Sequence, residues 1–203
     1  MVFYEPDKRD RDLLPHDPFK AFIAPRPIGW VSTVSASGAV NLAPYSYFNA
    51  VCDTPPTVMF SSNGAKDSMT FAHETGEFVW NMATWDLREP MNLSSADLPR
   101  GESEFVHAGL ELAPSRLVAP PRVAAAPVSL ECKVTQVVQI DDGPNIVTFG
   151  RVVGVHLDEA SIVLPVRRCS RHSSAISVRQ LRRRSVISPT PTSMSRHGLL
   201  RTR

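Results

Sequence analysis

The sequence contains few cysteines and no long apolar run, and these absences exclude several classes of protein. Three of the 203 residues are cysteine, at positions 52, 132 and 169, so neither a disulfide framework nor a zinc site is indicated. No apolar run approaches the roughly 20 residues that a membrane-spanning helix needs. The charged stretch at 7–12 lacks the apolar segment of a signal peptide. We therefore expect a cytoplasmic protein that does not enter a membrane, with reduced and mostly buried thiols.

The motifs of the common catalytic classes are missing as well. We find no GxSxG, HExxH, Walker A or GxGxxG pattern. The six histidines show no ligand-like pairing, so surface or structural positions are the simpler interpretation. The pair Asp141-Asp142 precedes Gly143-Pro144, which is typical of a turn. The sequence therefore predicts no catalytic dyad and no metal site.

Acidic residues are absent from positions 160–203, which hold ten of the 22 basic residues. Residues 1–159 hold the other 12 basic residues and all 20 acidic residues, so this part of the chain has a net charge of −8. We therefore divide the chain into a domain, 1–159, and a basic Arg/Ser-rich tail, 160–203, with the composition of unfolded chain. A shifted reading frame of a GC-rich gene would give such a tail. The alternative is a nucleic-acid-binding arm, which the lack of aromatic residues after Phe149 disfavours.

Strand patterns dominate the predicted domain. Hydrophobic residues make up 42% of the chain, enough for one domain with a full core. Alternation that begins at Val128 predicts a half-buried strand over 128–140, and turn residues at 141–145 predict a hairpin with 146–157. With no βαβ alternation, six or seven strands favour a closed or nearly closed antiparallel barrel. The other expected strands cover 28–35, 39–43, 45–52, 57–61 and 77–83, and short helices are expected near 66–76 and 86–92.

Proline and capping residues indicate where these elements should end. Five prolines in the first 27 residues predict an extended arm without helix. Pro44 predicts an interruption between strands, and Asp86 is a candidate N-cap for the second helix. The long connection over 97–126 predicts a functional surface or a lid, with one edge strand near 112–118.

Two segments have the composition of a binding site. In Asn41-Leu42-Ala43-Pro44-Tyr45-Ser46, Pro44 cannot donate to a strand ladder, so neighbouring N–H groups need other partners. A flat heteroaromatic ring is one suitable partner, and an ordinary kinked edge strand is the alternative. In Ser61-Ser62-Asn63-Gly64-Ala65-Lys66-Asp67-Ser68, hydroxyls and a lysine precede a helix, as in phosphate sites. The alternative here is a solvated, capped loop. Together the segments describe a ligand with a planar ring at one end and a phosphate at the other.

These segments resemble the flavin reductase-like, FMN-binding split-barrel family. The resemblance rests on Pro25-Arg26-Pro27-Ile28-Gly29-Trp30-Val31-Ser32-Thr33, Gly38, residues 41–48, Pro55-Pro56, Lys66-Asp67-Ser68, residues 75–81 and Leu130-Glu131-Cys132, and it covers about 15–157. It implies a mainly β fold, a six-stranded antiparallel Greek-key split β-barrel with short helices. It also implies a homodimer that holds FMN beside the subunit interface. The FMN-binding residues that it implies are Thr33, Ala43, Pro44, Tyr45, Ser46, Ser61, Ser62, Lys66, Ser68 and Asn81.

The activity that the resemblance implies is hydride transfer from NADH or NADPH to flavin. The missing catalytic dyad is consistent with this activity, because the flavin supplies the reactivity. In similar systems the reduced flavin passes to a flavin-dependent monooxygenase component. Two alternatives stay open, an FMN-binding electron-transfer or sensing protein without reductase turnover, and a basic-tailed nucleic-acid-binding protein. Related sequences continue in a conventional way after the strand at 150–157, and this chain departs from them there.

Overall fold

The chain divides into two units, and the main sheet lies in the second. The computed structural model describes residues 1–99 and 102–162. Met1–Arg26 form the first unit, and the second begins at Pro27. Apart from its first three residues, the predicted tail at 160–203 lies outside the described residues, so its boundary stays a prediction.

The first unit contains two single helical turns, η1 (Pro6–Lys8) and α1 (Phe19–Phe22). The expectation of no helix in this segment is therefore wrong. Proline removes a hydrogen bond only inside a helix, and Pro6 lies in the first turn of η1 while Pro18 is the residue before α1. A proline at either place leaves the helix intact because those N–H groups have no partner within the helix.

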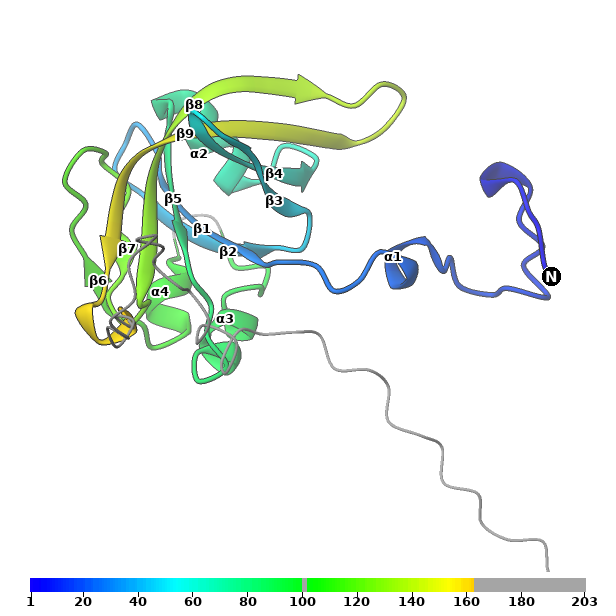
Figure 1. Cartoon of the computed structure of the whole chain (residues 1–203), viewed down its shortest axis with the longest axis horizontal. Helices are drawn as coiled ribbons and strands as arrows, with labels where there is room; N and C mark the ends of the chain where they lie inside the picture. The colour runs from blue at the N-terminus through cyan, green and yellow to red at the C-terminus, as the bar shows by residue number, and fades with distance from the viewer. Residues whose placement is uncertain (100–101, 163–203) are drawn as a thin grey trace, which may run out of the picture. The chain divides into compact units, whose positions relative to one another are not determined.

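The second unit is built on a seven-stranded antiparallel sheet with the order β2-β1-β5-β8-β9-β4-β3 (Figure 1). The fold is mainly β with few short helices, as predicted. The turn between the two longest strands contains Asp142 at a φ of 57°, which confirms turn chemistry for the aspartate pair. The strands are β1 (Gly29–Val34), β2 (Val40–Tyr45), β3 (Phe48–Asp53), β4 (Pro56–Asn63), β5 (Glu77–Asn81), β8 (Val128–Gln139) and β9 (Asn145–Leu157), with η2 (Glu159–Ser161) after β9.

The two edge strands of this sheet, β2 and β3, are consecutive in the chain and are separated only by Ser46 and Tyr47. The sheet therefore curls until its edges approach each other at this bend. The amide of Ser61 in β4 donates to the carbonyl of Tyr47 at 2.9 Å, and the rings of Tyr45 and Phe60 are 4.9 Å apart. Because the chain changes its pairing partner from β1 to β4 at the bend, the sheet has seven strands, within the six or seven that the residue patterns predict and one more than the six that the resemblance implies.

The inner face of the curled sheet carries the main core. Val31, Phe60 and Phe78 are fully buried there, and the rings of Phe60 and Phe78 meet edge to face with centroids 5.2 Å apart. Cys132 belongs to the same core, and burial raises the pKa of its thiol, so the group stays protonated. Cys52 is exposed on β3, so the expectation of mostly buried thiols holds for only one of the two described cysteines.

We expect Gly150→Ala to lower the free energy of unfolding by about 1–3 kcal/mol. A Cβ atom at Gly150 would overlap the ring of Phe78 and would lie 3.1 Å from the Cβ of Cys132. Chemical denaturation measures the effect. The cost should shrink in a Phe78→Leu background, because the smaller side chain leaves room for the methyl group. An equal cost in both backgrounds would contradict this account.

The outer face of the sheet is covered by residues 82–99 and 102–126 of the connection between β5 and β8. This connection contains α3 (Arg88–Leu93), α4 (Glu104–His107), and a second small sheet of β6 (Leu112–Ala113) and β7 (Arg122–Val123). A second core cluster lies between the two layers. Its buried members are Trp30, Leu42, Ala83, Phe105, Val123 and Ala126.

Two expectations about this connection are wrong. The strand expected near 112–118 ends at Ala113, since Pro114 follows and has no N–H to continue the ladder. The helix α3 begins at Arg88, and its N-cap position is held by Leu87 rather than Asp86. A turn closed by the Leu87 amide and the Thr84 carbonyl, 3.1 Å apart, precedes this helix and delays its start.

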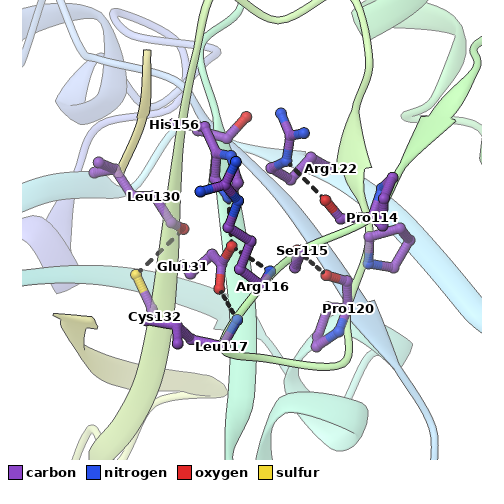
Figure 2. A network of polar contacts seen from close by, with 12 residues as sticks. Pro114, Ser115, Arg116, Leu117, Pro120, Arg122, Leu130, Glu131, Cys132 and His156 are labelled. Atoms are coloured by element: carbon purple, nitrogen blue, oxygen red, sulfur yellow. Dashed lines mark hydrogen bonds and ion pairs between the residues drawn. The ribbon is translucent and has the colours of Figure 1, made fainter. Parts of the chain in front are cut away.

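Polar side chains of the sheet hold residues 114–123 of the connection in place, as Figure 2 shows for Glu131. The two carboxylate oxygens of Glu131 accept the amides of Arg116 and Leu117 at 2.7 and 2.6 Å, and His156 pairs with the same carboxylate. Glu77 accepts the amide of Ala119 at 2.7 Å. In the part of the connection over 116–119, hydrogen bonds to the backbone thus fix the chain to the sheet, which does not favour a mobile lid there.

Candidate functional site

A cavity of about 280 Å³ lies between β2 and the start of α2 (Asp67–Thr75). It brings together the two sequence segments that were expected to form one site. Residues 94–98 and α4, from the outer layer, complete its wall. Five of the ten predicted site residues line it, namely Ala43, Pro44, Tyr45, Lys66 and Ser68.

The β2 wall of the cavity contains Pro44 inside a regular strand, paired with Trp30 of β1. The expected interruption at Pro44 is therefore wrong. The strand tolerates the proline because β2 is the edge of the sheet, where a missing N–H breaks no ladder. Ala43 and Pro44 are both half-buried, and their side chains are short. This wall therefore offers a surface without protruding side chains, against which a flat ring can lie.

The N-terminal end of α2 forms another part of the cavity wall, and the helix lies where the sequence predicts one. The helix ends as expected at Gly76, whose φ of 72° is the left-handed geometry of a C-terminal cap. At its start, Lys66 holds the N-cap position without a side-chain cap bond. The first amides of a helix lack partners within the helix and carry partial positive charge. This end of the cavity therefore has the donors that an anion needs.

A buried chain of polar side chains forms the floor between these walls. The hydroxyl of Ser68 donates to Oδ1 of Asn41 at 2.5 Å, and Nδ2 of Asn41 donates to Oε1 of Glu104 at 2.9 Å. The other carboxylate oxygen, Oε2, accepts the amide of Leu42 at 3.1 Å. Asn41 and Glu104 were not among the predicted site residues, although both line the cavity.

The charged side chains of the described residues that line the cavity are mostly acidic. They are Asp67, Asp97 and Glu104 together with one basic residue, Lys66, whose Nζ lies 4.0 Å from Oδ1 of Asp97 in an exposed pair worth little energy. Burial raises the pKa of Glu104, and hydrogen bonds from the backbone and from Asn41 oppose that rise. Burial also raises the pKa of Tyr45, while the nearby hydroxyls of Ser68 and Ser62 oppose it.

Three of the remaining predicted residues lie near the cavity without lining it. Ser46 is exposed in the bend between β2 and β3. Ser61 accepts a hydrogen bond from Nδ2 of Asn145 at 3.0 Å, and Ser62 is buried and donates to the carbonyl of Gly64 at 2.8 Å. The Ser62 hydroxyl therefore stabilises the turn that leads into α2, while the Ser61 hydroxyl joins β4 to β9. Direct contact of either with a cofactor stays a prediction.

The last two predicted residues, Thr33 and Asn81, are fully buried in the sheet. Asn81 donates to the Trp30 carbonyl at 3.3 Å, and it accepts the amide of Val123 at 2.9 Å and the hydroxyl of Ser129 at 3.1 Å. These bonds join the sheet to the outer layer. The hydroxyl of Thr33 has no hydrogen-bond partner among the described residues. A cofactor role for either residue stays a prediction.

A family model described as the flavin reductase like domain matches residues 22–168. The chain belongs to this family. A protein of Aquifex aeolicus is 39% identical over 142 residues, which are 68% of this chain and 71% of that protein. The resemblance that the sequence motifs suggested is therefore confirmed for the fold and the family.

Two solved structures are similar to this chain as well. Component B of nitrilotriacetate monooxygenase from Bacillus cereus superposes with a TM-score of 0.72 at 31% identity, over 79% of this chain and 83% of that one. The 2-nitrobenzoate 2-nitroreductase of Pseudomonas fluorescens superposes with a TM-score of 0.65 at 28% identity, over 73% and 76%. Family and neighbours together make this flavin reductase-like protein a flavin-related oxidoreductase.

The part of the chain that the structure describes contains no helix long and apolar enough to cross a membrane. Within the same residues, no group of three or more His, Cys, Asp or Glu side chains is placed to hold a metal ion. The candidate site of this flavin reductase-like protein is the cavity between β2 and α2, whose described polar groups include hydroxyl, amide and ammonium donors and the carboxylates of Asp67, Asp97 and Glu104.

Proposed function

We propose that the chain is an FMN-dependent NAD(P)H:flavin oxidoreductase whose cofactor binds in the cavity between β2 and α2. The observation that carries this proposal is that Ala43 and Pro44 of β2 line the same cavity as Lys66 and Ser68 at the start of α2. The family membership supports flavin as the ligand.

The residues that line the cavity suit both ends of FMN, the phosphate and the ring. Lys66, the hydroxyl of Ser68 and the first amides of α2 would hold the phosphate, since each is a donor or a positive charge. Ala43 and Pro44 would lie against the ring, where small side chains permit close approach. Bound FMN would supply the redox chemistry by accepting a hydride from NADH or NADPH. The protein then needs to bind and orient the flavin and to leave one face of its ring open.

A homodimer is part of the proposal. The cavity of about 280 Å³ lies just below the range of roughly 300–1,000 Å³ that is usual for small-molecule sites. One chain would therefore hold part of the cofactor, and a second copy would cover the rest, as the family resemblance implies. A flavin-dependent monooxygenase component is the proposed recipient of reduced flavin, supported by the neighbour that is component B of such a system.

Purification of the full chain followed by its visible spectrum tests the cofactor. We expect a yellow protein that releases FMN on denaturation and that oxidises NADH or NADPH when flavin is added. A yellow protein without this turnover would indicate the electron-transfer or sensing alternative. A colourless protein that also fails to bind added FMN would contradict the proposal, and nucleic-acid binding by such a protein would support the basic-tail alternative.

We expect Lys66→Ala to weaken FMN binding about tenfold at low salt, which corresponds to about 1.4 kcal/mol. The change removes a positive charge from the proposed phosphate end, and the loss should be smaller at high salt because Lys66 is exposed. Fluorescence titration with FMN measures it. Riboflavin, which has no phosphate, should bind wild type and variant equally. Lys133→Ala is the matched control, because Lys133 is an exposed lysine on β8 outside the cavity lining.

A further inference from the structure

Glu104 is a carboxylate that the proposed reaction does not use, and it lies against the proposed phosphate end. It is 8% exposed, it lines the cavity, and both of its oxygens accept hydrogen bonds. An ionised carboxylate can only accept. The facing group of Asn41 must therefore be its NH₂, which turns the amide oxygen of Asn41 toward Ser68.

The orientation of Asn41 in turn fixes the proton of Ser68. Because the amide oxygen of Asn41 is an acceptor, the Ser68 hydroxyl donates to it at 2.5 Å. That proton is then not available to a ligand, although Ser68 lines the cavity. While Glu104 is ionised, the chain from Glu104 through Asn41 to Ser68 therefore withholds a donor from the proposed phosphate end.

The charges near Glu104 also disfavour a phosphate. Asp67, on α2, acts on Glu104 by repulsion and raises its pKa together with burial. On the side of β2 the titratable group is Tyr45, and His107 is the other titratable group of α4. Lys66 and Asp97 line the same cavity and form an exposed pair with each other. Among the described residues that line the cavity, a phosphate that enters would thus meet three carboxylates and one ammonium group.

We propose that Glu104 takes up a proton from solvent when a phosphate-bearing flavin binds, and that this reverses the hydrogen bonds from Glu104 to Ser68. The neutral carboxyl donates to Oδ1 of Asn41 after the amide turns over, and Nδ2 of Asn41 donates to Ser68. The Ser68 hydroxyl is then free to donate to a phosphate oxygen, while Leu42 still donates to the other oxygen of Glu104. The inference rests on the proposed FMN site and makes Glu104 a positioning residue in it.

Turning over a side-chain amide exchanges an oxygen for an NH₂ group at nearly the same position. The reversed chain therefore needs no movement of β2, α2 or α4, and each of its contacts keeps a donor and an acceptor. Proton uptake also removes one of the three negative charges beside the phosphate. Both effects act in the same direction, toward tighter binding of the phosphorylated flavin.

The pH dependence of FMN affinity tests this inference. In wild type, FMN affinity measured by fluorescence titration should fall as the pH rises above the pKa of Glu104 in the free protein, by up to about tenfold per pH unit, because binding takes up a proton. Glu104→Gln mimics the protonated side chain, since its NH₂ donates to Asn41 and its oxygen accepts the amide of Leu42. We expect this variant to bind FMN with little pH dependence and about tenfold more tightly than wild type at pH 8.5.

Two controls separate the effect from a general loss of charge. Glu102→Gln removes the same charge two residues away, from an exposed side chain that lines a different cavity of about 510 Å³, and it should keep the wild-type pH dependence. Riboflavin should bind wild type and Glu104→Gln with the same, pH-independent affinity. Calorimetry of wild type in two buffers of different ionisation enthalpy measures the proton uptake directly and needs no variant.

The results distinguish this inference from the proposed function. If FMN does not bind wild type at any of the pH values tested, both the proposed function and the inference about Glu104 are wrong. If FMN binds and Lys66→Ala weakens it, yet Glu104→Gln keeps the wild-type pH dependence or calorimetry shows no proton uptake, the inference about Glu104 is wrong and the FMN site stands.

Discussion

Glu131→Ala should lower the free energy of unfolding by about 3–5 kcal/mol, because it removes the carboxylate that fixes the outer layer to the sheet. The Glu131 side chain is fully buried between β8 and the connection (Figure 2). Its loss leaves the amides of Arg116 and Leu117 without their acceptor and His156 without its partner. Chemical denaturation measures the change. Glu111→Ala, on an exposed residue of the same connection, is the control and should change stability by less than about 0.5 kcal/mol.

The same carboxylate predicts an acid-sensitive part of the stability. Burial raises the pKa of Glu131, but hydrogen bonds from His156 and from the amides of Arg116 and Leu117 outweigh it and hold the pKa below its usual range. A lowered pKa means that the stabilisation is fully present above the unfolded glutamate pKa of about 4.3 and is lost as the pH falls through the folded value. Glu131→Ala should lose this acid-dependent part. If the free energy of unfolding of Glu131→Ala falls as steeply with decreasing pH below about 4.3 as that of wild type, this account of Glu131 is wrong.

Phe78→Ala should also cost about 3–5 kcal/mol, by leaving a cavity in the inner core. Phe78 is fully buried at the centre of the curled sheet, against Phe60 and above Gly150. Phe78→Leu keeps most of the volume and should cost less than about 1.5 kcal/mol. Denaturation of both variants gives the difference. Equal losses for alanine and leucine would show that ring shape, rather than filled volume, governs this core.

The strands that the sequence predicted best are those with a local signal. The alternation after Val128 and the turn at 141–145 place β8 and β9 to within a residue or two, since a hairpin depends on neighbouring residues alone. Pro44 was misread because its effect depends on whether its strand is an edge, and only the assembled sheet shows that. Asp86 was misread because the turn that begins at Thr84 shifts the helix start.

The candidate site was predictable where one segment supplies it and not where distant segments meet. Pro44 and Lys66 come from motifs with recognisable composition, and the cavity brings those motifs together. Glu104 contacts Asn41 from 63 residues away, out of a connection with little regular pattern. No spacing rule links such positions. An acidic residue directly before an apolar one in a short helix was the only local signal that Glu104 gave.

The hydrogen bonds that hold the outer layer have a consequence for how its sequence can vary. Glu131 and Glu77 bind the peptide N–H groups of residues 116, 117 and 119, and not their side chains. Every amino acid except proline carries that group. The side chains at these three positions are therefore free to differ among related proteins while the path of the backbone stays the same, and selection there should act against proline and on the two glutamates.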